Sequence, residues 1–268
     1  MKIYHRDYSV LTDTEEAELK KILLKEEVHK LGDLVIRKNL IREYPKAARH
    51  SVSLFPNNYL DFVDLERKEE LNLSTNLFLD NLDSGLIKNE QDVLGFIKNN
   101  QAYFIIGSIF NYYNFGHHEA YIFPEFTLGS KYRVDYLLIG KNSDGYSFIF
   151  VELEHPIKDI TLLDGELGQA YRKGIIQTKE WKSWLFSNYS NVSDTLKKYK
   201  NSQTSLPEEF FILDPTRFNY VVVAGRRDNI NERTRRIRRE HLQEQQILLL
   251  HYDNLIDSAK AIIHQGNY

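Results

Sequence analysis

The alternation of apolar and polar positions is clearest after residue 90, where it predicts strands and helices in turn. In residues 91–111 apolar side chains recur at helical spacing, with a break near Asn99 and Asn100. Further along the chain, strands are predicted at 121–128, 132–140, 146–155, 219–225 and 246–252, and helices at 162–188, at 231–244 and after Asp253. This order predicts an α/β fold with a mixed central sheet flanked by helices.

The first 88 residues have a less regular pattern and are predicted as an α+β region of unknown role. A charged helical stretch at 15–30 follows Thr12, a typical capping residue. Short strands are predicted at Leu34–Ile36 and 51–55, and residues 81–91 have the composition of a turn or linker. We therefore divide the chain into residues 1–88 and residues 89–268.

Composition limits the class of protein and the class of metal site. The chain has 268 residues, of which 42% are hydrophobic and 27% are charged, as in ordinary soluble proteins. No apolar run predicts a membrane span or a secretory signal, and the lack of cysteine fits a cytoplasmic location. Without thiolates, a metal ion would need oxygen or imidazole ligands.

Two carboxylates lie at the end of the very apolar strand 146–155. Side chains two apart along a strand point the same way, so Glu152 and Glu154 share a face with Phe148 and Phe150. Carboxylates in such a position are costly to bury unless they are paired or bind a metal ion. The pattern therefore indicates a functional role for this strand end.

The neighbouring strand supplies possible partners for both glutamates. A hairpin loop at 142–145 places Asp135 opposite Glu152 and Arg133 opposite Glu154, whereas a slip of one residue would move Asp135 to the other face. Oxygen ligands a few ångströms apart suit Mg²⁺ or Mn²⁺. Such an ion can neutralise a phosphodiester oxygen and lower the pKa of an attacking water.

Six segments of the chain, in order, resemble the nuclease domain of Shedu-type bacterial defence proteins. They are FIKNN, FPEFTLGSKYRVDYLL, FVELEHP, QTKEW, VVVAGRR and HYDNLI, and they span roughly residues 90–265. Shedu-type nuclease domains belong to the PD-(D/E)XK superfamily, so the resemblance implies a restriction-endonuclease-like core. It further implies Mg²⁺-dependent hydrolysis of DNA in defence against phage, and assembly into a homo-oligomer.

The resemblance also implies roles for single residues. Asp135 matches the metal-binding aspartate of the superfamily and Glu152 its second metal ligand. The main-chain carbonyl of Leu153, between the two glutamates, is a further candidate ligand. Gln177 lies where members often have a glutamine near the active site, and Glu125 is a candidate additional acid.

Position 154 departs from the family pattern, which has lysine there. This chain has Glu154, and some restriction endonucleases of the superfamily use a glutamate at this position as a metal ligand or base. A displaced positive charge could come from Arg133, Lys158 or Lys173, of which the register favours Arg133. In the alternative interpretation, Glu154 forms only a cross-strand ion pair with Arg133.

Contacts with DNA must come from local basic surface, because the formal net charge is −3. The candidate contacts are Arg133, Lys158, Arg226 and Arg227. The arginines of helix 231–244 either contact phosphates or form ion pairs on a solvated helix face.

Other polar residues are predicted to have ordinary structural roles. Gln169 and His155 are weaker candidates for the site. The sequence His117-His118-Glu119 is not predicted to bind metal, because adjacent histidines point to opposite faces of a strand.

The sequence is therefore interpreted as a Mg²⁺- or Mn²⁺-dependent nuclease that acts on DNA, with catalysis by Asp135, Glu152, Glu154 and Gln177. The alternative is a catalytically silent relative that binds nucleic acid or a partner protein. A third possibility is an interaction scaffold without affinity for nucleic acid, which salt-dependent DNA binding would distinguish from the other two.

Overall fold

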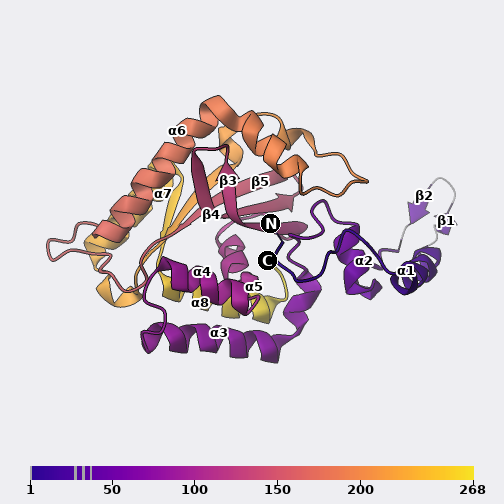
Figure 1. Cartoon of the computed structure of the whole chain (residues 1–268), viewed down its shortest axis with the longest axis horizontal. Coiled ribbons are helices and arrows are strands. Elements are labelled where there is room, and N and C mark those ends of the chain that lie inside the picture. The colour runs from indigo at the N-terminus through magenta and orange to yellow at the C-terminus, as the bar shows by residue number, and fades with distance from the viewer. Residues whose placement is uncertain (1, 27–28, 32–33, 37) are drawn as a thin grey trace.

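The centre of the molecule is a five-stranded mixed sheet (Figure 1). The computed structural model describes residues 2–26, 29–31, 34–36 and 38–268. The strands lie in the order β3 (Glu119–Leu128), β4 (Tyr132–Asn142), β5 (Gly145–Leu153), β6 (Phe218–Val223) and β7 (Ile247–Leu250). The pairs β3–β4 and β4–β5 are antiparallel, whereas β5–β6 and β6–β7 are parallel. The predicted α/β class and mixed sheet are confirmed.

Helices cover both faces of this sheet (Figure 1). One face carries α6 (Gln169–Lys197) and α7 (Glu232–Gln245). The other carries α3 (Lys68–Asp83), α4 (Glu90–Asn99), α5 (Tyr103–Gly107) and α8 (Tyr252–Gln265). Strand β5 is buried on both sides, since Phe148 and Phe150 pack into the α6 core and Ile149 and Val151 into the α8 core. Its continuous apolar sequence follows from this double burial.

The predicted helix at 91–111 is broken where the two asparagines indicated. Helix α4 begins after Asn89, which forms a capping box with Asp92, and ends at Asn99. Gln101 has a positive φ of 50°, and α5 follows, continued by a 3-10 turn at Ser108–Tyr112. The left-handed residue gives the change of direction between the two helices.

Helix α6 starts later than predicted, at Gln169 instead of 162; it is kinked at Asn188, where the predicted helix ends, and continues beyond the kink to Lys197. The segment before it forms a tight loop, in which Thr161 pairs with Leu167 and Gly165 has a φ of 83°. A Cβ at Gly168 would lie 2.0 Å from the carbonyl oxygen of Asp159. These glycines allow a compact turn that the helical spacing of the apolar residues did not reveal.

The N-terminal region was predicted only in part. Helix α1 (Asp13–Lys25) begins with the expected cap at Thr12 but is shorter than predicted, and β1 (His29–Leu31) follows; residues 27 and 28 of the predicted helix lie outside the described residues. Strand β2 (Leu34–Ile36) is confirmed and pairs with β1.

The strand predicted at 51–55 is wrong, because this segment ends helix α2 (Lys46–Ser51) and then turns. The Ser51 and Ser53 hydroxyls donate to the carbonyls of Ala48 and His50, which stabilises the helix end. Helix α3 and the 3-10 turns at Ile41–Glu43 and Phe62–Glu66 were not predicted.

Residues on both sides of position 88 contribute to one core. Phe78 and Leu82 of α3 pack in the same cluster as Leu255 and Ile262 of α8. The segment around Tyr59 lies along β3, where the backbone N–H of Leu60 donates to the carbonyl of Ala120 at 2.9 Å. The division at residue 88 stays a prediction, and the two parts are in extensive contact.

No helix in the described part of the chain has the length and apolar character needed to cross a membrane.

Candidate active site

The β4–β5 hairpin has the predicted register. Lys141 pairs with Tyr146, although the loop is two residues shorter than expected because Asn142 also pairs with Gly145. The ladder ends at the pair Tyr136–Val151, one step before Asp135 and Glu152, and beyond it the Asp135 carboxylate bonds to the main chain of β5 and interacts electrostatically with Glu152. The two carboxylates therefore lie where the sheet stops pairing and side chains can take over the hydrogen bonds.

Asp135 is held by the main chain of the neighbouring strand. Its Oδ2 accepts a hydrogen bond of 2.7 Å from the backbone N–H of Leu153. Burial raises the pKa of this carboxyl above its ordinary value, and the bond from Leu153 opposes part of that rise. No sequence pattern indicated this bond, which fixes the direction of the carboxylate.

Glu152 is a buried carboxyl whose negative charge Lys173 compensates only in part. The residue is only 5% exposed, and its Oε2 has no hydrogen-bond partner among the described residues. Burial raises the pKa of Glu152 strongly, and the nearby charges of Asp135 and Glu154 raise it further. A cation beside this carboxyl would lower its pKa again, because a positive charge stabilises the ionised form.

Glu154 is also buried, at 2% exposure, but a lysine accompanies it. The Nζ atom of Lys173, on α6, lies 3.1 Å from the Glu154 carboxylate and 3.7 Å from that of Glu90. The strand end itself is fixed, since the backbone N–H of Glu154 donates to Val223 and the Tyr252 hydroxyl donates to the Glu154 carbonyl. Burial raises the pKa of Glu154, and Lys173 opposes the rise.

The expected pairing of Arg133 with Glu154 is wrong. Arg133 instead reaches Glu125 of β3, with 3.1 Å between Nη1 and Oε1. Glu125 has a positive φ of 50°, which interrupts β3 beside this point. The β4–β5 ladder has already ended at this point, and the Glu154 side chain pairs with Lys173 of α6 instead.

Two residues that the sequence analysis did not select help to shape the site. Glu90, the first residue of α4, brings a second carboxylate within ion-pair distance of Lys173, and only the cap at Asn89 marked that helix start. Gly174 lets α6 approach the sheet, since a Cβ there would lie 2.4 Å from Val222 and 3.3 Å from the Glu154 side chain. A larger residue would push Lys173 away from Glu154.

The family model for the C-terminal part of the Shedu protein SduA matches residues 88–256, well over half of the chain. The chain belongs to this Shedu family. Membership suggests a role in anti-phage defence. No curated protein matches the chain.

The Shedu match includes all the acidic residues described above, and it also includes the other candidates. Gln169 and Gln177 line an open groove together with Arg133 and Lys173, so the structure brings these four residues to one surface beside the carboxylates. No hydrogen bond joins Gln177 to Asp135 or Glu152. Its catalytic role stays a prediction.

The histidine candidates have local roles. The His155 Nδ1 accepts from the backbone N–H groups of Ile157 and Lys158, which stabilises the turn after β5 and places Lys158 on it. His117 and His118 pack edge to face, with 4.5 Å between ring centroids.

The other arginines of this Shedu chain are largely paired with carboxylates. Arg226 binds Asp253 and Asp83, and Arg227 binds Asp257. On α7, Arg235, Arg236 and Arg239 pair with glutamates of the same helix. This agrees with the solvated-face interpretation of the arginine helix, and the proposed DNA contacts of Arg226 and Arg227 remain untested.

The donor set suits a hard cation but does not form a complete cage. The buried and unpartnered oxygen of Glu152, opposite Asp135, is the chemistry that Mg²⁺ or Mn²⁺ prefers. Within residues 2–26, 29–31, 34–36 and 38–268, no three acidic or histidine side chains converge as a ready-made metal site. This pattern fits Mg²⁺, which usually has one or two protein carboxylates and takes its remaining ligands from water and phosphate.

Proposed function

We propose that the protein is a Mg²⁺- or Mn²⁺-dependent nuclease that hydrolyses DNA phosphodiesters in defence against phage. One observation carries the proposal: the carboxyl of Glu152 is buried without a partner, opposite Asp135, at the open end of a strand pair. Unpaired buried carboxylates destabilise a fold, and their presence is explained when they bind a cation. Family membership and the resemblance to PD-(D/E)XK nucleases support the same reading.

In this proposal Asp135 and Glu152 hold the metal ion, with the Leu153 carbonyl as a further possible ligand. When bound, the ion would supply charge neutralisation at the phosphate and a lower pKa for the attacking water. The Leu153 N–H holds one Asp135 oxygen and leaves the other for the cation. Burial of Glu152 excludes water from one side of the site, which strengthens the attraction to a cation.

In this proposal Lys173 has the role of the lysine that the superfamily has at position 154. It reaches the same place from α6 instead of from β5, and it is bound to Glu154. Its ammonium group can donate to a non-bridging phosphate oxygen while Glu154 holds it in place. Glu154 is then a positioning residue, and the lysine is the group that contacts substrate.

Plasmid cleavage with Mg²⁺, Mn²⁺ or EDTA tests this function by comparing the wild type with Asp135→Ala. We expect cleavage to require the metal ion and to fall by more than about 100-fold in the variant, beyond the range for residues that only orient a ligand. Circular dichroism checks that the variant is folded. Equal cleavage by both proteins would refute the assignment of Asp135.

A catalytically silent protein that binds nucleic acid or a partner is the second candidate. The pairing of Glu154 with Lys173 favours it, since each residue neutralises the other. The variants Glu154→Lys and Lys173→Met separate the two candidates. If Lys173 acts on substrate, Lys173→Met lowers kcat and Glu154→Lys does not restore it. If the site is silent, the wild type is inactive and only Glu154→Lys can gain activity.

Assembly into a homo-oligomer is an expectation from the same resemblance, and light scattering during gel filtration measures it directly.

A further inference from the structure

A groove beside the carboxylates runs between the start of β4 and the outer face of α6. Its part next to the site has a volume of about 670 Å³ and includes Lys173, which binds Glu154. A second hollow continues it to Ser183 and Trp184, and the two share the lining residues Lys131, Tyr132, Ile176 and Glu180. The groove is therefore one continuous surface that starts at the candidate site.

Positive charge lines both walls of this groove. Lys131 and Arg133 lie on the β4 side, and Arg172, Lys173 and Lys179 lie on α6. The acidic lining residue is Glu180. Arg172 and Lys179 are seven residues apart, so both point from the same face of the helix.

Three of these cations lack a partner carboxylate. Among the described residues, no ion pair involves Lys131, Arg172 or Lys179, whereas Arg133 binds Glu125 and Lys173 binds Glu154. Exposed cations on facing walls repel one another, and a polyanion between them removes that repulsion. Ile176, between them on the helix, is 60% exposed and offers an apolar contact.

We propose that this groove binds the backbone of the cleaved DNA strand, on one side of the phosphate that is cut. The proposal rests on the function proposed above and identifies Lys131, Arg172 and Lys179 as its phosphate contacts. The distance from Arg172 to Lys179 is about 10 Å along the helix, at 1.5 Å per residue. This length corresponds to about three nucleotides of one strand at 3.4 Å each.

DNA binding by the full chain tests the groove separately from cleavage. Every protein carries Asp135→Asn, and binding of a labelled DNA is measured in EDTA at several salt concentrations. The test variant is Arg172→Ala with Lys179→Ala. The matched control is Arg235→Ala with Arg236→Ala, which removes the same two charges from exposed positions on α7.

We expect the groove variant to bind DNA about 10- to 100-fold more weakly near physiological salt. The slope of log K against log salt should be smaller by about 2, since each phosphate contact contributes about 0.9. The control should keep the parental affinity and slope. Equal losses in the two variants, or none in the groove variant, would overturn the proposal.

The outcome is distinguishable from failure of the nuclease function. If wild-type protein does not cut DNA but binds it through the groove, the nuclease proposal fails and the groove proposal stands. If wild-type protein cuts DNA and the groove variant binds DNA normally, the nuclease proposal stands and the groove proposal fails. Melting temperatures of both double variants exclude unfolding as the cause of lost binding.

Discussion

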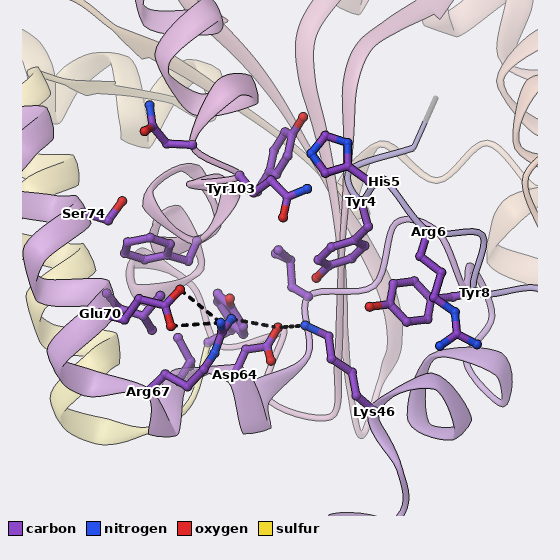
Figure 2. Close-up of a pocket in the computed structure, with 17 residues that line it drawn as sticks. Tyr4, His5, Arg6, Tyr8, Lys46, Asp64, Arg67, Glu70, Ser74 and Tyr103 are labelled. Carbon is purple, nitrogen blue, oxygen red and sulfur yellow. Dashed lines mark hydrogen bonds and ion pairs between the residues drawn. The ribbon is translucent and has the colours of Figure 1, made fainter. Parts of the chain in front are cut away.

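Two hollows of this molecule differ in how their charges are compensated. The first is a pocket of about 320 Å³ between the N-terminal region and helix α5, and the second is the groove along α6. Figure 2 shows that Lys46 and Arg67 reach toward Asp64 in the first pocket, and that Arg67 also binds Glu70. In the groove, no carboxylate of the described residues forms an ion pair with Arg172 or Lys179.

The acidic residues show the same contrast. Asp64 has two cations beside it, whereas burial and neighbouring carboxylates raise the pKa of Glu152. The N-terminal pocket is lined in part by tyrosines and leucines, among them Tyr4, Tyr103 and Leu60. Uncompensated charge identifies the surface that needs an external partner.

Glu152→Gln should give the largest effect of any change that tests this contrast. We expect DNA cleavage to fall by more than about 100-fold, because the substitution removes a metal ligand. The metal-free variant should melt at the same or a higher temperature than the wild type at alkaline pH, since an unpaired buried charge is removed. A plasmid assay and a melting curve measure both effects, and retained cleavage would contradict the assignment of this glutamate.

Metal binding should stabilise the protein, and more strongly as the pH rises. Burial raises the pKa values of Asp135, Glu152 and Glu154 above those of the unfolded chain. The folded state therefore binds more protons, so the metal-free protein loses stability as pH rises above about 4. Mg²⁺ binds the ionised carboxylates and reverses this loss.

At a concentration of 100 times Kd the gain is about 2.7 kcal/mol, or roughly 5–10 °C in Tm. Differential scanning fluorimetry at acidic and alkaline pH measures the shift with and without Mg²⁺. Asp135→Asn is the control and should remove it. A shift that is independent of pH, or that survives in this variant, would show that the ion binds elsewhere.

Gly174→Ala should lower the free energy of unfolding by about 1–3 kcal/mol, because the added Cβ would lie 2.4 Å from Val222. It should also reduce cleavage, since Lys173 moves away from Glu154. Gly95→Ala in α4 is a matched control, because nothing lies within 4 Å of a Cβ at Gly95. Urea unfolding should show that Gly95→Ala is neutral or stabilising by up to about 1 kcal/mol, and equal losses in both variants would disprove the close-packing argument.

Asp64→Asn should have the smallest effect, which would complete the comparison with Glu152→Gln. Loss of the negative charge beside Lys46 and Arg67 should lower stability by about 1 kcal/mol, as expected for partly exposed ion pairs. Cleavage and DNA binding should be unchanged. A large loss of cleavage would show that the N-terminal pocket takes part in the function.

The sheet and the central hairpin could be predicted from sequence because their signals are local. The apolar sequences of β4 and β5 and the turn residues between them predicted the register, which the pairs from Asn142–Gly145 to Tyr136–Val151 follow. The partner of Glu154 could not be predicted in this way. This partner, Lys173, lies on α6, which packs closely on the sheet because Gly174 has no side chain. The spacing of residues along the sequence does not reveal such a contact between distant elements.

Helix α3 and Glu90 were missed for a related reason. Leu71, Thr75, Phe78 and Leu82 form the buried side of α3, but the exposed Leu73 and Leu77 obscure that pattern. Glu90 is one of many charged residues at helix starts, and its nearness to Lys173 depends on how α4 packs against the sheet. Long-range packing decides both features.

The contact of residues 58–60 with β3 has a consequence for any shortened form of the protein. These residues donate to and accept from the main chain of β3, so they cap an otherwise open border of the sheet. A protein trimmed to the family-matched segment would present bare strand hydrogen-bonding groups at this border, and it would also lose most of α8, which extends from Tyr252 to Gln265. Such a fragment should self-associate through that border and form insoluble material, whereas a fragment that begins before residue 58 should keep the border closed.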